Sequence, residues 1–480
     1  MNLPKHIHVI GICGVATSAL AIAFKNAGVR VTGSDKGFFP PVSTELEKNG
    51  IDFYAGWHPE NMVAGGAPDL VMIGGGGTSP SNPETVYARE HGIPACSYAE
   101  ALQRYFIKKN SIVVAGTWGK TTASSLLSYI LIQAGLDPSY FTGGLSLSHP
   151  TGALVDSDWS VVEGDEYQVS ISDRRPKFVY YAPTHLLLTS VSWDHADLYP
   201  TEKDYFAAFD KLVAGIPVNG LIVACTDNAG VNQLLTSASI ATKKAVVSYG
   251  QNESADYRLH DIAQSKDGLS FTITHEGKDY AIKSPMLGRF NAENMAGCFA
   301  MACEIGIPAE KIIAAIGSFK GIKRRFEKRL EGGSRGIIVF DCHAPTPEKA
   351  AAVLKELHEI YGRAGAKSAG GQIIAVYEPN IGGRERASIA KYDDAFKDAD
   401  FVLIPRLTKL KVAEDSSGQP MEGAELATTI KKTHSHSQLL EDDEALVSTL
   451  VSETKKGDVI VFLGSHGWRG MIEETVKKLA

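Results

Sequence analysis

A glycine-rich loop followed by a lysine and two threonines carries the clearest chemical signal in this sequence. Residues 115–125 read AGTWGKTTASS, and Gly116 and Gly119 enclose only two residues before Lys120. An apolar run precedes the loop and a helical pattern follows it, so backbone N–H groups, the helix dipole and the lysine can all meet phosphate oxygens. The Thr121 hydroxyl can hold Mg²⁺. This placement favours a phosphate site over a plain glycine turn, and its predicted residues are Gly116, Thr117, Gly119, Lys120, Thr121 and Thr122.

Two acidic clusters follow later apolar runs. VVEGDEYQ and TSVSWDHADLY together carry Glu163, Asp165, Glu166, Asp194, His195 and Asp197. Open parallel sheets bind ligands at the carboxyl ends of their strands, where carboxylates and a histidine could hold a cation or orient a nucleophile. Each cluster alone could equally cap a helix or form a turn. Their shared position after a nucleotide loop favours the functional interpretation.

The N-terminal GICGVATSALA is similar to a dinucleotide-binding fingerprint. Gly11 and Gly14 stand between a predicted strand and a predicted helix, the third glycine is absent, and Asp35 ends the next strand as a ribose-binding acid would. This pattern indicates a nucleotide diphosphate without singling out NAD. The backbone-rich GGGGTSPSNP at residues 74–83 could contact a ligand or simply turn the chain.

Basic residues and two further strand ends mark the last third of the chain. KGIKRRFEKR contains Lys320, Lys323, Arg324, Arg325, Lys328 and Arg329. Most of such a run is typically solvated, but one arginine in a cleft could stabilise charge on a transferring phosphoryl group. In VFDCHAPTPEKA, Asp341 and His343 are candidates for binding a nucleotide. In VYEPNIGGRERAS, Arg384 and Arg386 are candidates for binding a substrate carboxylate. Each of these residues could equally be an ordinary loop residue.

Short apolar runs alternating with amphipathic segments must position these residues. The alternation predicts parallel sheets covered by helices, while 257–264 and 269–285 resemble antiparallel ribbons and KFVYYAP (177–183) is predicted as another strand. We therefore expect an α/β protein of three domains. They are a Rossmann-like domain at 1–109, a P-loop ATPase-like parallel sheet with extra antiparallel strands at 110–328, and a Rossmann-like domain at 329–480.

Composition narrows the functional classes. A chain of 480 residues fits about three domains, and 48 basic against 55 acidic residues (48 − 55 = −7) gives no support for nucleic acid as the main partner. Six cysteines without CxxC pairs argue against a disulfide framework or a structural zinc. We expect no signal peptide and no membrane span, because no apolar run approaches about 18 residues, and hence a cytoplasmic protein.

The motifs, in this order and over essentially the whole chain, resemble the Mur ligases, ATP-dependent amino-acid and peptide ligases of peptidoglycan assembly. GTWGKTT is similar to their short phosphate loop, EGDEY to their Glu-Ala-Asp-Glu, DHADLY to their Asp-His motif, GRFNAENMAG to their adenine loop and GIKRRFE to their last-domain arginine. The resemblance implies ATP and Mg²⁺ as cofactors and ADP as a product. It implies these roles: Lys120 on the β and γ phosphates, Thr121 and Glu166 on one Mg²⁺, His195 on a second, Arg325 against developing charge, and Asn291, Asn294 and Asp341 on the nucleotide.

Two branches of the family begin with a UDP-sugar-binding domain whose glycine turn resembles GICG. FFPPVSTELEKNGI, EYQVSISDRRPKFVYYAPTHLLL and GSHGWRGMI are more similar to the recycling branch, which joins UDP-N-acetylmuramate to the amine of L-alanyl-γ-D-glutamyl-meso-diaminopimelate through an acyl phosphate. The resemblance places the sugar nucleotide at Gly11, Gly14 and Asp35, and Phe209 where other branches carry a carbamylated lysine. The alternatives are the L-alanine-adding branch and a catalytically altered ligase-like protein. A dehydrogenase built on GICG would leave the central motifs unexplained.

Several positions depart from the family pattern. DCHAPTP replaces Asp-Asp-Tyr/Phe-Ala-His-His-Pro, so Cys342 stands for an acid, and YEPNIGGRERAS differs from the usual third-domain loop. Trp118, Ser190 and Phe290 replace a His or Asn, an Asn and a His, respectively. These departures concern which amine the protein accepts and how fast it turns over. They leave the phosphate loop, Glu166 and His195 in place.

Overall fold

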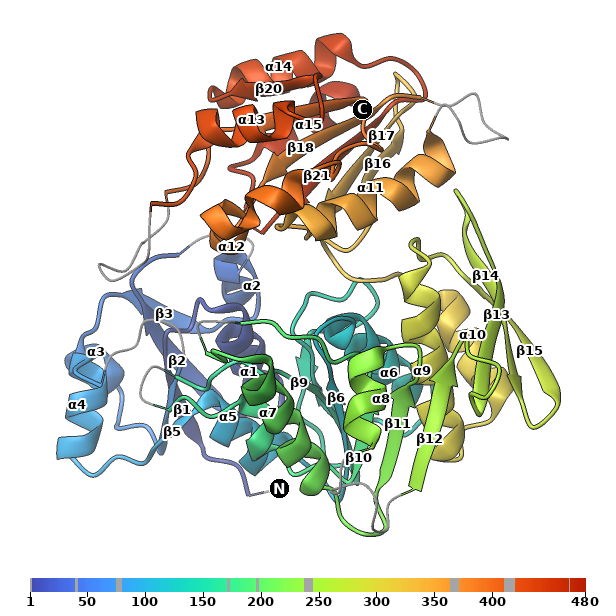
Figure 1. Cartoon of the computed structure of the whole chain (residues 1–480). Coiled ribbons are helices and arrows are strands. Elements are labelled where there is room, and N and C mark those ends of the chain that lie inside the picture. The colour runs from blue at the N-terminus through green and yellow to red at the C-terminus, as the bar shows by residue number, and fades with distance from the viewer. Residues whose placement is uncertain are drawn as a thin grey trace. The chain divides into compact units, whose positions relative to one another are not determined.

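The computed structural model shows three sheets in two compact units (Figure 1). It describes residues 2–38, 42–74, 80–170, 173–195, 198–236, 245–362, 371–409, 419–465 and 467–480. Unit 1 comprises Met1–Ile262, Ser270–Pro285 and Phe290–Lys320. Unit 2 comprises Ala263–Leu269, Met286–Arg289 and Gly321–Ala480. The three-domain α/β architecture expected from the sequence is confirmed in its three sheets.

The first sheet of unit 1 is parallel throughout. Its strands are β1 (His6–Ile10), β2 (Arg30–Asp35), β3 (Asp52–Ala55), β4 (Leu70–Ile73) and β5 (Ala95–Ser97), in the order β3-β2-β1-β4-β5. Its helical segments are α1 (Val15–Asn26), α2 (Val42–Lys48), α3 (Pro59–Met62), α4 (Pro83–Glu90), α5 (Tyr98–Ala101) and the π-helix η1 (Leu102–Phe106). The fully buried β1 lies where the strand order reverses. A Rossmann-like sheet binds its ligand at that point, so the turn after β1 is well placed.

The second sheet of unit 1 has ten strands in the order β15-β14-β13-β12-β11-β10-β6-β9-β7-β8. They are β6 (Asn110–Ala115), β7 (Ser139–Phe141), β8 (Gly152–Ala153), β9 (Trp159–Gly164), β10 (His185–Leu188), β11 (Leu221–Cys225), β12 (Ala245–Gly250), β13 (Tyr257–Ser265), β14 (Gly268–His275) and β15 (Lys278–Ser284). Its helices are α6 (Lys120–Ala134), α7 (Glu202–Ala214), α8 (Ala229–Leu235), α9 (Phe290–Glu304) and α10 (Ala309–Ser318). Strand β6 pairs in parallel with both β9 and β10, so the loops after these three strands meet at one edge.

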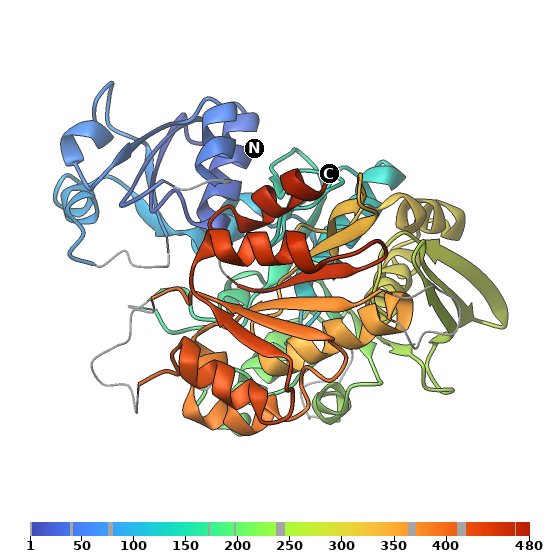
Figure 2. The same ribbon diagram turned by 90° about the horizontal axis from the view of Figure 1, so that it is seen from above.

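Unit 2 is built on a six-stranded sheet in the order β16-β17-β21-β18-β19-β20, in which only β16 is antiparallel to its neighbour. The strands are β16 (Glu327–Gly332), β17 (Ile337–Cys342), β18 (Ile373–Glu378), β19 (Phe401–Pro405), β20 (Ser437–Leu440) and β21 (Val459–Gly464). The helices are α11 (Pro347–Tyr361), α12 (Ile381–Arg384), the 3₁₀ helix η3 (Arg386–Tyr392), α13 (Gly423–Lys431), α14 (Asp443–Glu453) and α15 (Met471–Leu479). Val339 and Phe340 enter different buried clusters, as alternate residues of a strand must when helices cover both faces (Figures 1 and 2).

One predicted strand is wrong. Within KFVYYAP the structure has a 3₁₀ helix, η2 (Lys177–Tyr180). Pro176 precedes it and its carbonyl accepts a hydrogen bond from Val179 N–H, which closes a helical turn, while the N–H groups of Lys177 and Phe178 donate to the carbonyls of Tyr167 and Asp165. Phe178 and Tyr181 are fully buried, and their spacing of three matches a helical turn. Apolar composition alone could not distinguish this spacing from a short buried strand.

None of the helices in the described parts of the chain is long and apolar enough to cross a bilayer.

Candidate active site

The loop between β6 and α6 requires its two glycines. Gly116 and Gly119 have φ angles of +145° and +83°, which residues with a side chain rarely adopt. A Cβ atom on Gly116 would lie 2.2 Å from Thr189 Oγ1, and one on Gly119 would lie 2.3 Å from Asn294 Oδ1. The backbone of this loop is therefore packed closely against the segment after β10 and against α9.

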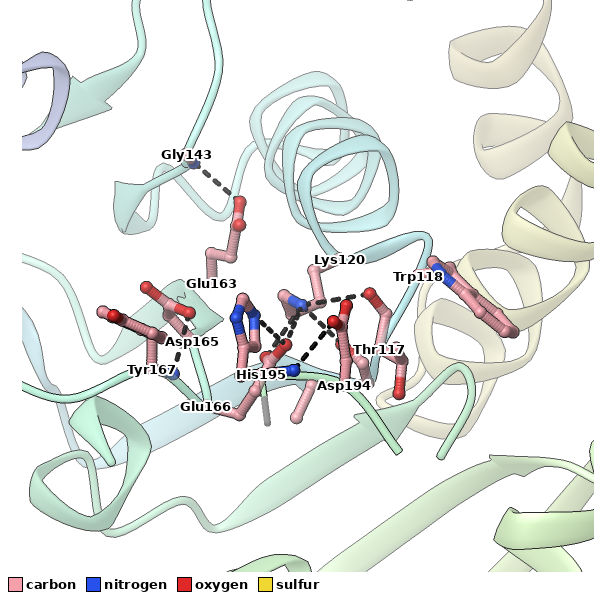
Figure 3. Close-up of polar contacts among 12 residues, drawn as sticks. Thr117, Trp118, Lys120, Gly143, Glu163, Asp165, Glu166, Tyr167, Asp194 and His195 are labelled. Carbon is pink, nitrogen blue, oxygen red and sulfur yellow. Dashed lines mark hydrogen bonds and ion pairs between the residues drawn. The ribbon is translucent and has the colours of Figure 1, made fainter. Parts of the chain in front are cut away.

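Lys120 and Glu166 form a buried ion pair beside the loop (Figure 3). Lys120 Nζ lies 2.8 Å from Glu166 Oε2, and the side chains are 13% and 2% exposed. Nζ also donates to the carbonyl oxygen of Gly116 at 2.6 Å. The ammonium group is thus held at the mouth of the loop, where it would meet phosphate oxygens.

His195 joins this pair from the segment after β10. Its Nε2 lies 3.6 Å from Glu166 Oε1, and its ring packs edge-on against Tyr167 at 4.9 Å between centroids. Burial lowers the pKa of His195, but the carboxylates of Glu166 and Asp194 outweigh burial and hold the pKa above its ordinary value. The structure therefore brings together the phosphate loop and both acidic clusters, as the sequence predicted, with the exception of Asp197, which lies outside the described residues.

Thr121 pairs with a different carboxylate from the one expected. Its hydroxyl donates to Glu163 Oε1 at 3.1 Å, whereas Glu166 is bound by Lys120. The backbone N–H of Gly143 donates to the other Glu163 oxygen at 2.7 Å. Burial raises the pKa of Glu163 in spite of the nearby Lys120 charge. A cation beside Thr121 would relieve that cost, which makes Glu163 its natural carboxylate neighbour.

These groups fit a nucleoside triphosphate with a divalent cation. The two glycines leave room that a Cβ would fill, and backbone N–H groups lie at the start of α6. Both oxygens of the buried Glu166 carboxylate face the Lys120 ammonium, at 3.0 and 2.8 Å, so a divalent cation could take the place of that ammonium. Carboxylates at Glu163 and Glu166 and the hydroxyl of Thr121 are the oxygen ligands that Mg²⁺ prefers, and His195 adds a nitrogen.

Sequence reasoning missed the supports of these groups. The Tyr199 hydroxyl donates to the Glu166 carbonyl at 2.5 Å, and the Thr117 hydroxyl lies 2.9 Å from the Tyr205 hydroxyl. Lys177 donates to Asp165 at 2.5 Å. In the sequence the two tyrosines are indistinguishable from ordinary core residues. Only the fold shows that their hydroxyls hold the segments that carry Glu166 and Thr117.

The two asparagines expected to meet the nucleotide lie at the start of α9. Asn291 and Asn294 are buried, and Asn294 Nδ2 donates to Asn291 Oδ1 at 3.2 Å. Two aromatic rings are open to solvent: Trp118, in the loop between β6 and α6, is 52% exposed, and Phe290, directly before Asn291, is 45% exposed. Trp118 points away from the Lys120–Glu166 pair, and its backbone N–H donates to Ser190 Oγ at 2.9 Å (Figure 3).

The N-terminal candidates also gather at one sheet edge. Gly11 has a φ of +79°, and Asp35 accepts the backbone N–H of Cys13 at 2.9 Å. Thr17 Oγ1 donates to the Gly11 carbonyl at 2.6 Å and would lie 2.8 Å from a Cβ on Gly14. Gly11, Gly14 and Asp35 are thus brought together. Residues 75–79 of GGGGTSPSNP lie outside the described residues.

Within unit 2, arginines hold the predicted nucleotide residue Asp341. Arg324 donates to its Oδ1 at 3.3 Å, and Arg329 lies 3.7 Å from its Oδ2. Burial nevertheless holds the pKa of Asp341 above its usual range. His343 donates its backbone N–H to the Arg324 carbonyl at 2.6 Å, and Arg325 lies exposed just before β16. The nucleotide roles of Asp341 and Arg325 stay predictions.

The two arginines assigned to a substrate carboxylate differ in their surroundings. Arg384 is 2% exposed, and it donates to the carbonyls of Met421 and Thr408 and to Glu422. These contacts favour a structural role. Arg386 is exposed and pairs with Glu425, so its role stays a prediction. Cys342 is fully buried in a hydrophobic cluster, which indicates packing.

Comparison with known proteins decides the family. Three family models match: "Mur ligase family, catalytic domain" at residues 6–109, "Mur ligase middle domain" at 114–302, and "Mur ligase, glutamate ligase domain" at 324–466. The UDP-N-acetylmuramate–L-alanine ligase of Paenarthrobacter aurescens is 32% identical over 465 residues, which cover 96% of this chain and 94% of that relative. The chain belongs to the Mur ligase family. As a Mur ligase it is an ATP-dependent, ADP-forming enzyme that makes amide bonds.

Solved Mur ligase structures share this fold. The UDP-N-acetylmuramate-alanine ligase of Thermotoga maritima superposes with a TM-score of 0.78 at 23% identity and covers 99% of both chains. A murein peptide ligase from Psychrobacter arcticus gives 0.69 at 26% identity, covering 99% of this Mur ligase and 98% of that chain.

Proposed function

We propose that this Mur ligase joins the lactyl carboxylate of UDP-N-acetylmuramate to L-alanine and releases ADP and phosphate. The meeting of Lys120, Glu166 and His195 beside the phosphate loop is the observation that carries the reaction type. Curated relatives named UDP-N-acetylmuramate–L-alanine ligase, at 31–32% identity over most of the chain, support the alanine-adding reaction. This is the alternative that the sequence motifs placed second.

The chemistry requires activation of a carboxylate, because a carboxylate at neutral pH is a poor acceptor of amines. One carboxylate oxygen attacks the γ-phosphorus of ATP, the bond to the β-phosphate oxygen breaks, and an acyl phosphate and ADP result. The amine nitrogen then attacks the acyl carbon, loses a proton, and phosphate leaves with the former carboxylate oxygen. Every step moves negative charge among oxygens, so fixed positive groups contribute most.

The residues of unit 1 can supply that charge. Lys120 would leave Glu166 in part to bind the β and γ phosphates, and the loop N–H groups would hold the same oxygens. Thr121 with Glu163, and Glu166 with His195, would each hold one Mg²⁺. Mg²⁺, when bound, neutralises charge on the phosphate oxygens. His195 must be neutral to bind it and would release its proton to water first.

The remaining assignments extend this proposal to the whole chain. Gly11, Gly14 and Asp35 would bind the sugar nucleotide in a domain at 1–109. ATP would occupy a domain at 110–328, with Asn291 and Asn294 toward the nucleotide. Arg325, Asp341 and Arg386 would act from a domain at 329–480. Closing water out of such a site would protect the acyl phosphate from hydrolysis.

A second amine is supported by separate observations. The stretches EYQVSISDRRPKFVYYAPTHLLL and GSHGWRGMI are similar to the tripeptide-adding branch. The UDP-N-acetylmuramate:L-alanyl-γ-D-glutamyl-meso-diaminopimelate ligase from Neisseria meningitidis is 30% identical, over 67% of this chain and all of that one, with a TM-score of 0.59. This reaction would use the same carboxylate and the same acyl phosphate, with the tripeptide amine as the nucleophile.

Turnover with each amine tests the proposal. The purified protein, ATP, Mg²⁺ and UDP-N-acetylmuramate are incubated with L-alanine or with the tripeptide, and ADP release and product mass are measured. Amide product with L-alanine alone supports the proposal, whereas product with the tripeptide alone assigns the recycling reaction. ADP release without amide product under both conditions would contradict both.

A further inference from the structure

Three potential metal ligands meet away from the phosphate loop. Cys225 ends β11, Asp227 lies in the turn that follows, and Glu293 belongs to the first turn of α9. One ligand atom from each lies within 4.8 Å of the others. Neither spacing nor motif links them in the sequence, and the packing of α9 against β11 and β12 brings them together.

The cluster has negative charge without a matching cation. Among the described residues, neither Asp227 nor Glu293 takes part in an ion pair with Lys, Arg or His. Burial raises the pKa of Glu293, a hydrogen bond with the Cys225 thiol lowers it, and the charge of Asp227 raises it. Asp227 receives the backbone N–H groups of Gln251 and Asn252, one on each oxygen, at 2.6 and 3.1 Å. Each oxygen keeps a second lone pair, so that turn does not exhaust the carboxylate.

A buried hydroxyl faces the same place. Tyr249 is fully buried, its hydroxyl has no hydrogen-bond partner of good geometry among the described residues, and the cluster member that it interacts with is the Cys225 thiol. It is the register partner of Cys225 on β12, so both side chains project from the same face of the sheet. A Cβ on Gly297 would lie 2.8 Å from this hydroxyl, and Gly297 is one helical turn after Glu293 on the same face of α9. The hydroxyl is therefore directed at the α9 face that carries Glu293.

We propose that Cys225, Asp227 and Glu293 bind one divalent cation of the zinc type, with water in the fourth position and the Tyr249 hydroxyl beside it. On binding, the bond between the metal and Cys225 Sγ forms as the thiol proton leaves to solvent, and no electron is transferred. A sulfur ligand selects Zn²⁺ or Co²⁺ over Mg²⁺, which prefers oxygen ligands alone. The cation would tie the turn after β11 to the first turn of α9, and the site does not depend on the proposed ligase reaction.

Cobalt absorption tests this site directly. The metal-free full chain is titrated with Co²⁺ in excess Mg²⁺, which fills oxygen-rich sites, and the thiolate-to-cobalt charge-transfer band is recorded. We expect the band to saturate at one Co²⁺ per chain and to vanish when Zn²⁺ displaces Co²⁺. Cys225→Ser should abolish it, while Cys303→Ser, on the same helix α9, should keep it.

Variants of the oxygen ligands provide an independent test. Glu293→Gln and Asp227→Asn leave the buried thiol in place and should weaken Co²⁺ binding about 10-fold or more. These two variants still test the site if Cys225→Ser does not fold. A full-strength band in Cys225→Ser, an absent band in the wild-type chain, or unchanged affinity in Glu293→Gln would each overturn the proposal.

Discussion

At the residue scale, the central feature is the ammonium group of Lys120, whose charge is neutralised by a carboxylate. Lys120 is nearly buried and is neutralised by Glu166 at 2.8 Å. A buried ammonium group would be costly without that partner, and the partner sits where a cation could replace it. An arriving Mg²⁺ could therefore take over Glu166 while Lys120 turns to the phosphates.

Replacing Lys120 should remove most of the turnover. We expect Lys120→Ala to lower kcat on the order of 100-fold or more, because it deletes the fixed positive charge on the phosphate oxygens. ADP release under saturating substrates measures this. Lys203→Ala, an exposed lysine on α7, is the matched control and should retain normal turnover. Near-normal turnover in Lys120→Ala would remove the loop from the mechanism.

The protonation of His195 should depend on Glu166. Its pKa is raised because carboxylates outweigh burial, so Glu166→Gln should lower that pKa, as an NMR titration of the imidazole in the metal-free protein can show. A raised folded-state pKa adds stability below the unfolded value near 6.5, and that stability is lost as the pH rises through the folded value. The variant should therefore lose stability at acidic pH more than at alkaline pH. A His195 pKa that stays constant or rises would contradict the pairing.

At the element scale, β6 and its two parallel neighbours position the site. Loops that leave the carboxyl ends of β6, β9 and β10 supply Lys120, Glu166 and His195, respectively. The chain needs glycine where the first loop turns, and the structure offers a matched pair of glycines to test this.

Two alanine substitutions separate strain from site geometry. Gly119 and Gly135 have φ angles of +83° and +84°, but a Cβ on Gly135 meets nothing within 4 Å. Both variants should lose about 1–2 kcal/mol of unfolding free energy from the left-handed backbone. Only Gly119→Ala should also lose ATP affinity, on the order of 10-fold or more, because its methyl group would press on Asn294. Calorimetric titration with ATP measures this, and equal affinities in both variants would refute the close packing of the loop.

Sequence patterns predicted those features of the fold and the site that depend on residues close together in the chain. The alternation of strands and helices, the glycine loop and the acidic strand ends are local, so the sheets and the meeting of Lys120, Glu166 and His195 were predictable. The Thr121–Glu163 bond and the Cys225 cluster depend on strand register and helix packing. No local pattern encodes these. The strand predicted at KFVYYAP was wrong because a short apolar run can form either a buried strand or a 3₁₀ turn.

At the scale of the whole molecule, three sheets are divided between two compact units. Lys120, Glu163, Glu166 and His195 all lie in unit 1. Binding of nucleotide by these residues should therefore be visible in the stability of unit 1 itself.

Nucleotide should raise the melting temperature of the unit 1 transition. At an ATP concentration of 100 times Kd with Mg²⁺, linkage adds about 2.7 kcal/mol to the folded state. Differential scanning calorimetry of the full chain should show this shift in the wild type and lose most of it in Lys120→Ala. A shift of the same size in that variant would show that ATP binds elsewhere.

Transfer of a labelled oxygen tests the acyl phosphate most directly. UDP-N-acetylmuramate with both lactyl carboxylate oxygens replaced by ¹⁸O is turned over with ATP, Mg²⁺ and the accepted amine, and the released phosphate is weighed by mass spectrometry. Our account predicts one ¹⁸O in each phosphate, because the carboxylate oxygen that attacked phosphorus leaves with it. Phosphate without the label, formed while ADP and amide accumulate, would contradict the mechanism that we assign to this site.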